Sequence, residues 1–256
     1  MDDPDAASGE GLTDVGRILA RLPVDPRFGR MVLAADDLDC VADVIIIAAG
    51  LSIRDPRERP PGAEAQMAAK DHKRFAHPDS DLLGWLLLWE HLETQRRKRS
   101  GNQFRKMCRA EHLNFLRIRE WQDVERQLRQ YATSAGIDVG KRHRTRAPHH
   151  EDDIHLAILT GLVSQFGQYD PENRDYKGPR NTRFSVGRES ALSKKPPKWV
   201  MAAEMVDTNK IWARGVARIQ PSWLEDAAPH LIKRRHSEPW WDADRGEAVT
   251  SETVSL

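Results

Sequence analysis

The sequence has few cysteines and no long hydrophobic run. Its 256 residues include two cysteines, Cys40 and Cys108, each among apolar residues in a helical pattern, which favours buried free thiols over a disulfide or a metal site. The longest apolar runs, VIIIAAGL and LLGWLLLW, are much shorter than the roughly 20 residues that span a bilayer. The first residues, MDDPDAASGEG, are acidic, whereas a secretory signal begins with a basic segment. We therefore expect a soluble cytoplasmic protein with no membrane partner.

The chain also lacks a large net charge of either sign. It has 40 lysines and arginines against 39 aspartates and glutamates, a formal net charge of +1. The sum of charges thus indicates no polyanionic partner, and the charges have to be interpreted by their positions. Charged residues are 31% and hydrophobic residues 39% of the chain, which is typical of a globular protein with large solvated surfaces.

A nucleotide-binding motif is missing too. A phosphate loop ends in Gly-Lys followed by Ser or Thr, because the hydroxyl holds magnesium while backbone N–H groups hold the phosphates. The only Gly-Lys pair, Gly140–Lys141, is followed by Arg142. We therefore expect no cofactor and no ATP or magnesium site in this chain.

Three other polar stretches are better explained by structure than by catalysis. HPDSD holds His, Ser and Asp within one turn, too close for a triad, and Ser80 or Asp81 is expected to cap a helix. HRTRAPHHEDDIH has no cysteine and matches no tetrahedral metal spacing. Glu204 is expected to pair with an arginine across a sheet. No catalytic constellation is recognisable.

The first part of the chain predicts helices. Thr13 is expected to cap a helix through Ala20, and Pro26 to begin another. The runs LDCVADVIIIAAGLSI and DLLGWLLLWEHL are apolar on nearly every side, as expected for buried helices of a bundle. A long amphipathic helix ends at Gly136. We expect an all-α bundle over residues 36–136.

The pattern changes to strands after a basic, proline-containing linker at residues 137–150. A short helix from residue 151 is followed by four strand-like segments, separated by Gly, Pro, Asn and Asp turns: LVSQFGQY, TRFSVG, KWVMAAEMV and KIWARGVARI. A helix begun by Pro221 follows. Short strands with a small helix predict a β-barrel of the oligonucleotide-binding (OB) type over residues 151–241. The fold class is therefore α+β and multidomain, and residues 1–11 and 242–256 are expected to be disordered tails.

Alternation in the last strand-like segment predicts two different faces. One face is expected to pack, and the other to present an indole and two guanidinium groups. The packed face comprises Ile211, Ala213, Gly215, Ala217 and Ile219, and the other face Trp212, Arg214, Val216 and Arg218.

Two stiff basic turns complete the candidate nucleic-acid site. IRDPRERPP places Arg54, Arg57 and Arg59 after a buried helix, and KKPPKW places Lys194, Lys195 and Lys198 before a strand. Cations neutralise phosphates and aromatic rings stack on bases. The alternative is that carboxylates such as Asp55, Glu58 and Asp71 neutralise the arginines, that Trp199 is core, and that RRKRSGN coats a solvated helix. On these residues alone, a protein-binding adaptor remains open.

Several segments in order carry a resemblance to a known family. LTDVGRILARLPVDPRFGRMVLAA, IIIAAGLSIRDPRERP, HKRFAHPDSDLLGWLLLW, NFLRIREWQDVERQL and KKPPKWVMAAEMVDTNKIWARGVARIQPSWL, ending in HLIKRRHSEPWW, resemble the region after the motor of bacterial DEAH-box RNA helicases of the HrpA type. The resemblance implies the end of a winged helix at residues 12–35, then a ratchet bundle, then an OB fold.

The resemblance also implies a function. The parent would be an ATP-dependent 3′-to-5′ RNA helicase, with single-stranded RNA as partner. The RecA-like motor domains, where ATP and magnesium would bind, are not in this sequence, so we expect no ATP hydrolysis by this chain alone and expect those domains as a partner in trans. The alternative is a free-standing RNA-binding or helicase-regulating module without enzymatic activity.

Overall fold

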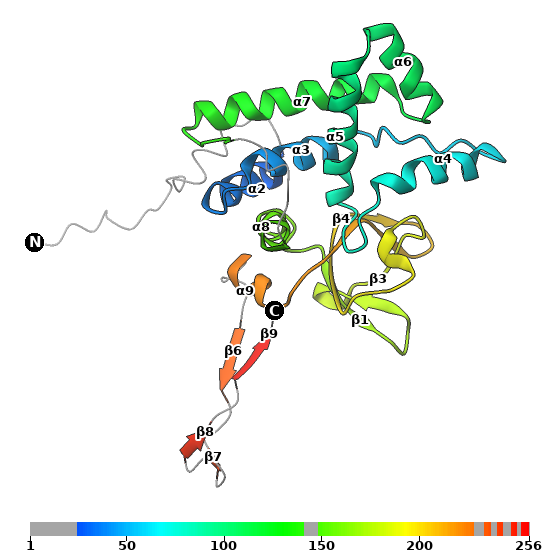
Figure 1. Ribbon diagram of the computed structural model, residues 1–256. Helices are drawn as coiled ribbons and strands as arrows, with labels where there is room; N and C mark the ends of the chain where they lie inside the picture. Colours follow the sequence, from blue (N-terminus) through cyan, green and yellow to red (C-terminus); the bar gives the residue numbers. More distant parts are fainter. Residues whose placement is uncertain are drawn as a thin grey trace, which may run out of the picture. The chain divides into compact units, whose positions relative to one another are not determined.

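The protein is described by a computed structural model that forms two compact units, residues 1–161 and 162–256 (Figure 1). The structure describes residues 25–140 and 148–227, together with four short strands nearer the C-terminus. The expected helix from Thr13 to Ala20 and the first part of the expected winged-helix remnant lie outside the described residues.

The first unit is the expected all-α bundle. Its helices are α2 (Pro26–Asp37), α3 (Val41–Leu51), α4 (Glu64–His72), η1 (Lys73–Phe75), α5 (Leu83–Lys98), α6 (Gly101–Ala110), α7 (Phe115–Ser134) and α8 (Pro148–Leu159). As predicted, Pro26 is the first residue of α2, after Asp25, whose side chain accepts a hydrogen bond from the Arg27 N–H. The α3 helix is buried over almost its whole length and packs against α2, α5 and α7.

Three tryptophans form the centre of this bundle. Trp121 of α7 is completely buried, and its Nε1 donates to the Ile46 carbonyl of α3 over 2.9 Å. The rings of Trp85 and Trp89 of α5 meet the Trp121 ring edge-on, at 5.1 and 4.8 Å between centroids. Edge-to-face contacts of this kind add stability beyond the area that they bury. Gly50 gives Trp85 its room, since a Cβ there would lie 2.6 Å from the ring.

The α8 helix belongs to the bundle, whereas we expected it to open the barrel domain. It packs on α2, and a Cβ at Gly161 would meet the Arg27 carbonyl at 2.5 Å.

His150 contacts buried Asp43 at 3.1 Å, and His155 contacts the Ser80 hydroxyl at 2.7 Å. These partners are 75 to 107 residues away in sequence, so local pattern carried no sign of them. The Ser80 hydroxyl, predicted to cap α5, accepts from the Leu83 N–H at 3.1 Å, but the residue directly before the helix is Leu82, which makes no side-chain cap hydrogen bond.

The second unit contains the expected OB-type barrel. Five strands close in the order β1-β2-β3-β5-β4, where β1 is Phe166–Asp170, β2 Asp175–Lys177, β3 Arg183–Val186, β4 Trp199–Asp207 and β5 Ile211–Arg218. All pairs are antiparallel except β3 with β5. Short helices lie between and after the strands: η2 (Pro179–Asn181), η3 (Ala191–Ser193) and α9 (Ser222–Ala227).

Strand β2 was missed in the sequence. With three residues it is too short to show alternation, and yet its Tyr176 is 2% exposed and stacks on Phe184 of β3, at 5.5 Å between centroids. Gly167 of β1 makes this possible, because a Cβ there would lie 2.6 Å from the Phe184 ring. Tyr176 and Phe184 thus form part of the barrel core, together with Leu192, Val200, Ala202, Ala213 and Val216.

On β5, Ala213, Ala217 and Ile219 are buried as predicted and Arg214 and Arg218 are exposed, but the prediction for Val216 is wrong. Gly215 has a φ of +60°, a conformation that glycine adopts without steric cost. Beyond this residue the alternation shifts, and Val216, expected outside, is fully buried in the same core as Ala213. Because alternate residues of a strand point to the same side, Arg218 lies on the same side of β5 as Val216. Trp212 and Arg214 lie on the other side, so the three residues do not form one continuous face.

The C-terminal residues also differ from expectation. Strands β8 (Glu247–Val249) and β9 (Glu252–Ser255) lie within the segment expected to be a disordered tail. They pair antiparallel with β7 (Trp240–Asp242) and β6 (Lys233–His236), respectively. Each strand has only three or four residues, and a segment of that length is too short to show the alternation that predicts a strand.

Candidate nucleic-acid interface

The basic turn at Lys194–Lys198 is fixed to the barrel core. Tyr176 is buried under this turn, and its hydroxyl donates to the Pro197 carbonyl over 2.8 Å. Burial raises the pKa of the Tyr176 hydroxyl, so it keeps its proton and acts as a donor. The next carbonyl, that of Lys198, accepts from the Tyr169 N–H of β1 at 2.9 Å. The turn therefore holds its lysines in a fixed backbone geometry.

The three lysines of this turn all point their charge to solvent. Lys194, Lys195 and Lys198 are exposed, and none of them has an ion-pair partner among the residues that the structure describes. Three unpaired cations on a rigid turn are the arrangement that binds successive phosphates of a strand. Trp199, at the start of β4, is half-buried beside Phe166 at 6.4 Å between ring centroids, which agrees with its predicted role in packing.

Trp212 on β5 has a cation over its ring. The Lys210 ammonium lies 4.1 Å from the centroid and 3.3 Å from the Ser185 hydroxyl of β3. Ser185 is the register partner of Trp212 across the parallel β3–β5 pair. The indole is half-buried, so it can offer an edge or one face to a base while Lys210 meets a phosphate. Lys210, from the β4–β5 turn, is a candidate residue that our prediction left out of the site.

The arginines of β5 have acidic neighbours. Arg214 is opposite Glu204 of β4, as expected for a cross-strand partner, and its Nε lies 3.7 Å from Glu189. Its side chain is still 55% exposed, so this pair is screened by water and leaves the guanidinium accessible. Arg218 is exposed at the far end of the strand.

Another arginine of the barrel is fully engaged. Arg183 of β3 binds Asp175 of β2 and Asp170 of β1. Its hydrogen bond is the main cause that lowers the pKa of the Asp170 carboxyl, followed by that of Asn173. This surface of β1–β3, which often binds nucleic acid in OB folds, carries a neutralised cluster here. Exposed cations nevertheless lie in this region too, at Arg174, Lys177 and Arg180, in addition to those on the β3–β4 connection and the β4–β5 hairpin.

In the bundle, the turn at Arg54–Arg59 contains one arginine that faces inward. Arg57 donates to both carboxylate oxygens of Asp55, and its guanidinium stacks 5.0 Å over the ring of Trp85. Its side chain is 19% exposed. For this residue the alternative interpretation, neutralisation by Asp55, is the one that the structure supports.

The outer arginines of this turn remain at the surface. Arg54 and Arg59 are exposed, and within the described residues Arg54 has no ion-pair partner. The turn is anchored by Glu58, whose N–H donates to the His112 carbonyl at 2.8 Å, and by Asn114, whose N–H donates to the Pro56 carbonyl at 2.8 Å. Asp71 pairs with His112 rather than with an arginine.

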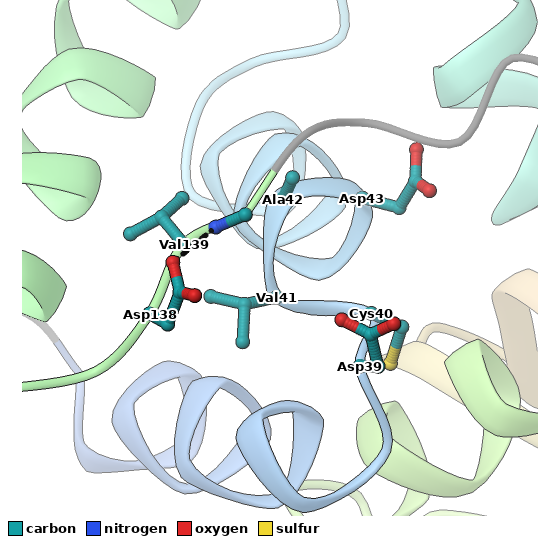
Figure 2. Close-up of a pocket in the computed structure, with 8 residues that line it drawn as sticks. Asp39, Cys40, Val41, Ala42, Asp43, Asp138 and Val139 are labelled. Atoms are coloured by element: carbon teal, nitrogen blue, oxygen red, sulfur yellow. Dashed lines mark hydrogen bonds between the residues drawn. The ribbon is translucent and has the colours of Figure 1, made fainter.

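One hollow of the bundle is too small for a substrate. This hollow, at the start of α3, is lined by Asp39, Cys40, Asp43 and Asp138, and it has room for about one water molecule (Figure 2). Burial, followed by the charge of Asp153, raises the pKa of the Cys40 thiol to about 12, so the thiol is unreactive. Cys108 is also a buried free thiol, with its pKa raised to about 11 by burial.

The described residues also hold no cluster of three or more metal-binding side chains. In the same residues there is no helix long and apolar enough to cross a membrane.

Two family models match the two units. A helicase associated domain (HA2), described as ratchet-like, matches residues 25–85, and an oligonucleotide/oligosaccharide-binding (OB) fold matches residues 154–232. The ratchet-like match covers α2 to the start of α5, and the OB match begins inside α8 and includes the whole barrel. Both are C-terminal regions of helicases.

The chain also matches parts of longer proteins. The chain is 47% identical over 98% of its length to the ATP-dependent RNA helicase HrpA of Escherichia coli (strain K12), of which it covers 19%. It is 46% identical over 96% of its length to the HrpA homolog of Haemophilus influenzae, of which it covers 18%. A probable ATP-dependent RNA helicase, DHX35 of Pongo abelii, is 25% identical over 86% of the chain. The chain thus spans about a fifth of the length of the two bacterial relatives.

Proposed function

We propose that this chain, which carries the ratchet and OB-fold regions of a DEAH-box RNA helicase, binds single-stranded RNA and guides it for a motor on other domains. The single observation that carries the proposal is the anchored turn of an OB barrel whose three lysines, Lys194, Lys195 and Lys198, are exposed and have no ion-pair partner among the described residues. The relatives' names support RNA rather than DNA as the polymer.

The barrel provides both kinds of contact that a single strand requires. Lys194, Lys195 and Lys198 would neutralise phosphates, each adding a salt-dependent contribution to affinity. Trp212 would stack on a base, which is worth about 1–3 kcal/mol per base. No base edge is read by these groups, so binding is expected to depend little on sequence.

The bundle would contribute phosphate contacts through Arg54 and Arg59. Arg57 would act indirectly, since its ion pair with Asp55 and its contact with Trp85 hold the turn in place. Movement of the strand along these surfaces would require ATP hydrolysis by motor domains, the partner that we propose in trans.

Direct binding to a labelled single-stranded oligoribonucleotide tests the proposal. Fluorescence anisotropy at low salt should show binding by the 256-residue chain alone, and binding should weaken steeply as salt rises. A chain that fails to bind at low salt would contradict the proposal.

A second candidate is a free-standing RNA-binding or helicase-regulating module. It is favoured by the observation that the bundle and the barrel each have their own buried core. Adding helicase motor domains in trans separates the two candidates: RNA-stimulated ATP hydrolysis that rises with the chain supports the guiding role. Unchanged hydrolysis, with RNA binding intact, supports the free-standing module.

A further inference from the structure

A third basic region lies on the hairpin formed by α5 and α6 (Figure 1), in a different part of the sequence from both turns discussed above. Between Thr94 and Ala110 the sequence has no aspartate or glutamate and seven basic residues: Arg96, Arg97, Lys98, Arg99, Arg105, Lys106 and Arg109. In a chain whose net charge is +1, this is a strong local excess. In the sequence we interpreted the run RRKRSGN as a solvated helix face.

Most of these cations are available. Arg96 pairs with Glu93 at 3.7 Å, and the guanidinium of Arg105 lies 4.9 Å over the ring of Phe115. The other five are exposed and have no ion-pair partner in the part of the chain that the structure describes: Arg97, Lys98, Arg99, Lys106 and Arg109.

The hairpin presents these charges in a fixed arrangement. The Ser100 hydroxyl accepts from the Gln103 N–H, and the Gln103 side chain accepts from the Ser100 N–H at 2.9 Å, a reciprocal capping box that begins α6 immediately after α5. On its other side, α6 buries Phe104, Met107 and Cys108. The cations are therefore mounted on a packed helix pair, not on a mobile loop.

Helix dipoles explain only part of this charge. Cations in the last turn of a helix interact favourably with its negative end, which accounts for Arg97, Lys98 and Arg109. Arg99 is the C-cap of α5 and so also lies at the negative end of that helix, whereas Lys106 lies in the middle of α6, away from both helix ends. Nor does the dipole explain the lack of carboxylates between Thr94 and Ala110.

We propose that the α5–α6 hairpin binds the phosphate backbone of duplex RNA. The choice of a duplex follows from the aromatic rings: Phe104 is buried, and Phe115 is covered by Arg105, so the surface has cations without a ring on which a base could stack. Single strands are bound by stacking together with phosphate contacts, whereas RNA duplexes are bound mainly by shape and by contacts to phosphates and 2′-hydroxyls. This inference rests on the proposed function, because it assumes that RNA is the polymer.

The test uses a blunt RNA duplex and the single strand of the same sequence as probes for the 256-residue chain. The variant Arg99→Gln with Lys106→Gln removes two exposed charges of the hairpin, one at the end of α5 and one in the middle of α6, that have no ion-pair partner among the described residues. Arg30→Gln with Arg119→Gln removes two exposed charges elsewhere on the bundle and is the matched control. Each lost phosphate contact lowers the slope of log affinity against log salt by about 1.

We expect the hairpin variant to lose about 2 units of slope and at least about tenfold in duplex affinity at 0.1 M salt, with single-strand affinity and melting temperature unchanged. The control should match the wild type. Unchanged duplex binding by the hairpin variant overturns the inference, and so does an equal loss of affinity for duplex and single strand. A variant that loses affinity for polyglutamate, an acidic polymer used as a further probe, but keeps its affinity for the duplex also overturns the inference. Failure of the proposed function is seen separately, as wild-type protein that does not bind the single strand.

Discussion

The hydroxyl of Tyr176, on the three-residue strand β2, donates a hydrogen bond to the carbonyl of Pro197 over 2.8 Å. The donor belongs to the barrel core and the acceptor to the turn that carries Lys194, Lys195 and Lys198. The two prolines limit the backbone of the turn, and this hydrogen bond fixes its position on the barrel. Rigid placement favours binding, because the backbone that carries the lysines is already ordered in the free protein and loses little conformational entropy when RNA binds.

Tyr176→Phe should therefore weaken RNA binding more than it weakens the fold. A single hydrogen bond contributes about 1 kcal/mol to stability, and the ring and its stacking on Phe184 are retained. We expect a small fall in melting temperature and a several-fold loss of single-strand affinity, measured by thermal unfolding and anisotropy. Equal affinity in the variant and wild type would show that the turn needs no anchor.

The lysine turn itself should contribute affinity without contributing stability. Lys194→Glu with Lys195→Glu is expected to weaken single-strand binding by at least about tenfold, since two phosphate contacts are lost and two repulsions appear. The melting temperature should stay within about 1 °C, because both side chains are exposed and unpaired. Arg30→Glu with Arg119→Glu gives the same change of charge on the bundle, and should leave the affinity close to that of the wild type. A similar loss in both variants would mean that only total charge matters.

Two arginines of one turn should behave differently. Arg57→Ala removes the ion pair with Asp55 and the contact with Trp85, and should destabilise the bundle by about 1–3 kcal/mol. Arg54→Ala should leave the denaturant midpoint unchanged and lower RNA affinity by a few-fold. The reverse pattern, with Arg57 dispensable for folding, would contradict the assignment of a positioning role.

The same pair predicts a dependence of stability on pH. Burial alone would raise the pKa of Asp55, but the charge and hydrogen bonds of Arg57 outweigh burial and hold the pKa below its ordinary value of 3.8. A carboxyl with a lowered folded pKa stabilises the protein above its unfolded pKa, and this contribution is lost as pH falls through the folded pKa. Asp55→Asn should thus be less stable than wild type at pH 7, and the difference should shrink below about pH 4. Denaturant unfolding across pH 2–7 measures the difference in free energy of unfolding between the wild type and Asp55→Asn. A difference that stays constant with pH would show that ionisation of Asp55 does not stabilise the fold.

The sequence predicts the architecture well where each element carries its own pattern. The buried α3 and α5, the N-terminus of α2 at Pro26 and the strands β1, β3, β4 and β5 all follow from apolar periodicity and turn residues. These signals are local, and they were sufficient for a bundle followed by an OB barrel. Strand β2 and the strands β6 to β9 are too short to show periodicity.

The site residues were harder to predict because side-chain direction depends on distant partners. Arg57 turns inward to Trp85, 28 residues later in the chain, and Gly215 shifts the face of β5 through one positive φ. Lys210 is recognisable in the sequence as a basic residue, but its contacts with Trp212 and Ser185 depend on the β3–β5 pairing, so it was not among the predicted site residues. A basic residue can be recognised in a sequence, but whether a carboxylate or a ring already holds it depends on the fold.

Mapping the crosslinks of a 4-thiouridine-labelled single-stranded RNA to this chain tests the central claim most directly. The account predicts crosslinked peptides that contain Lys194–Lys198 and Lys210–Trp212 in the barrel and Arg54–Arg59 in the bundle, all lost in competition with unlabelled single strand. Crosslinks confined to the Asp170–Arg183 surface or to α8, with none at the lysine turn, would contradict it.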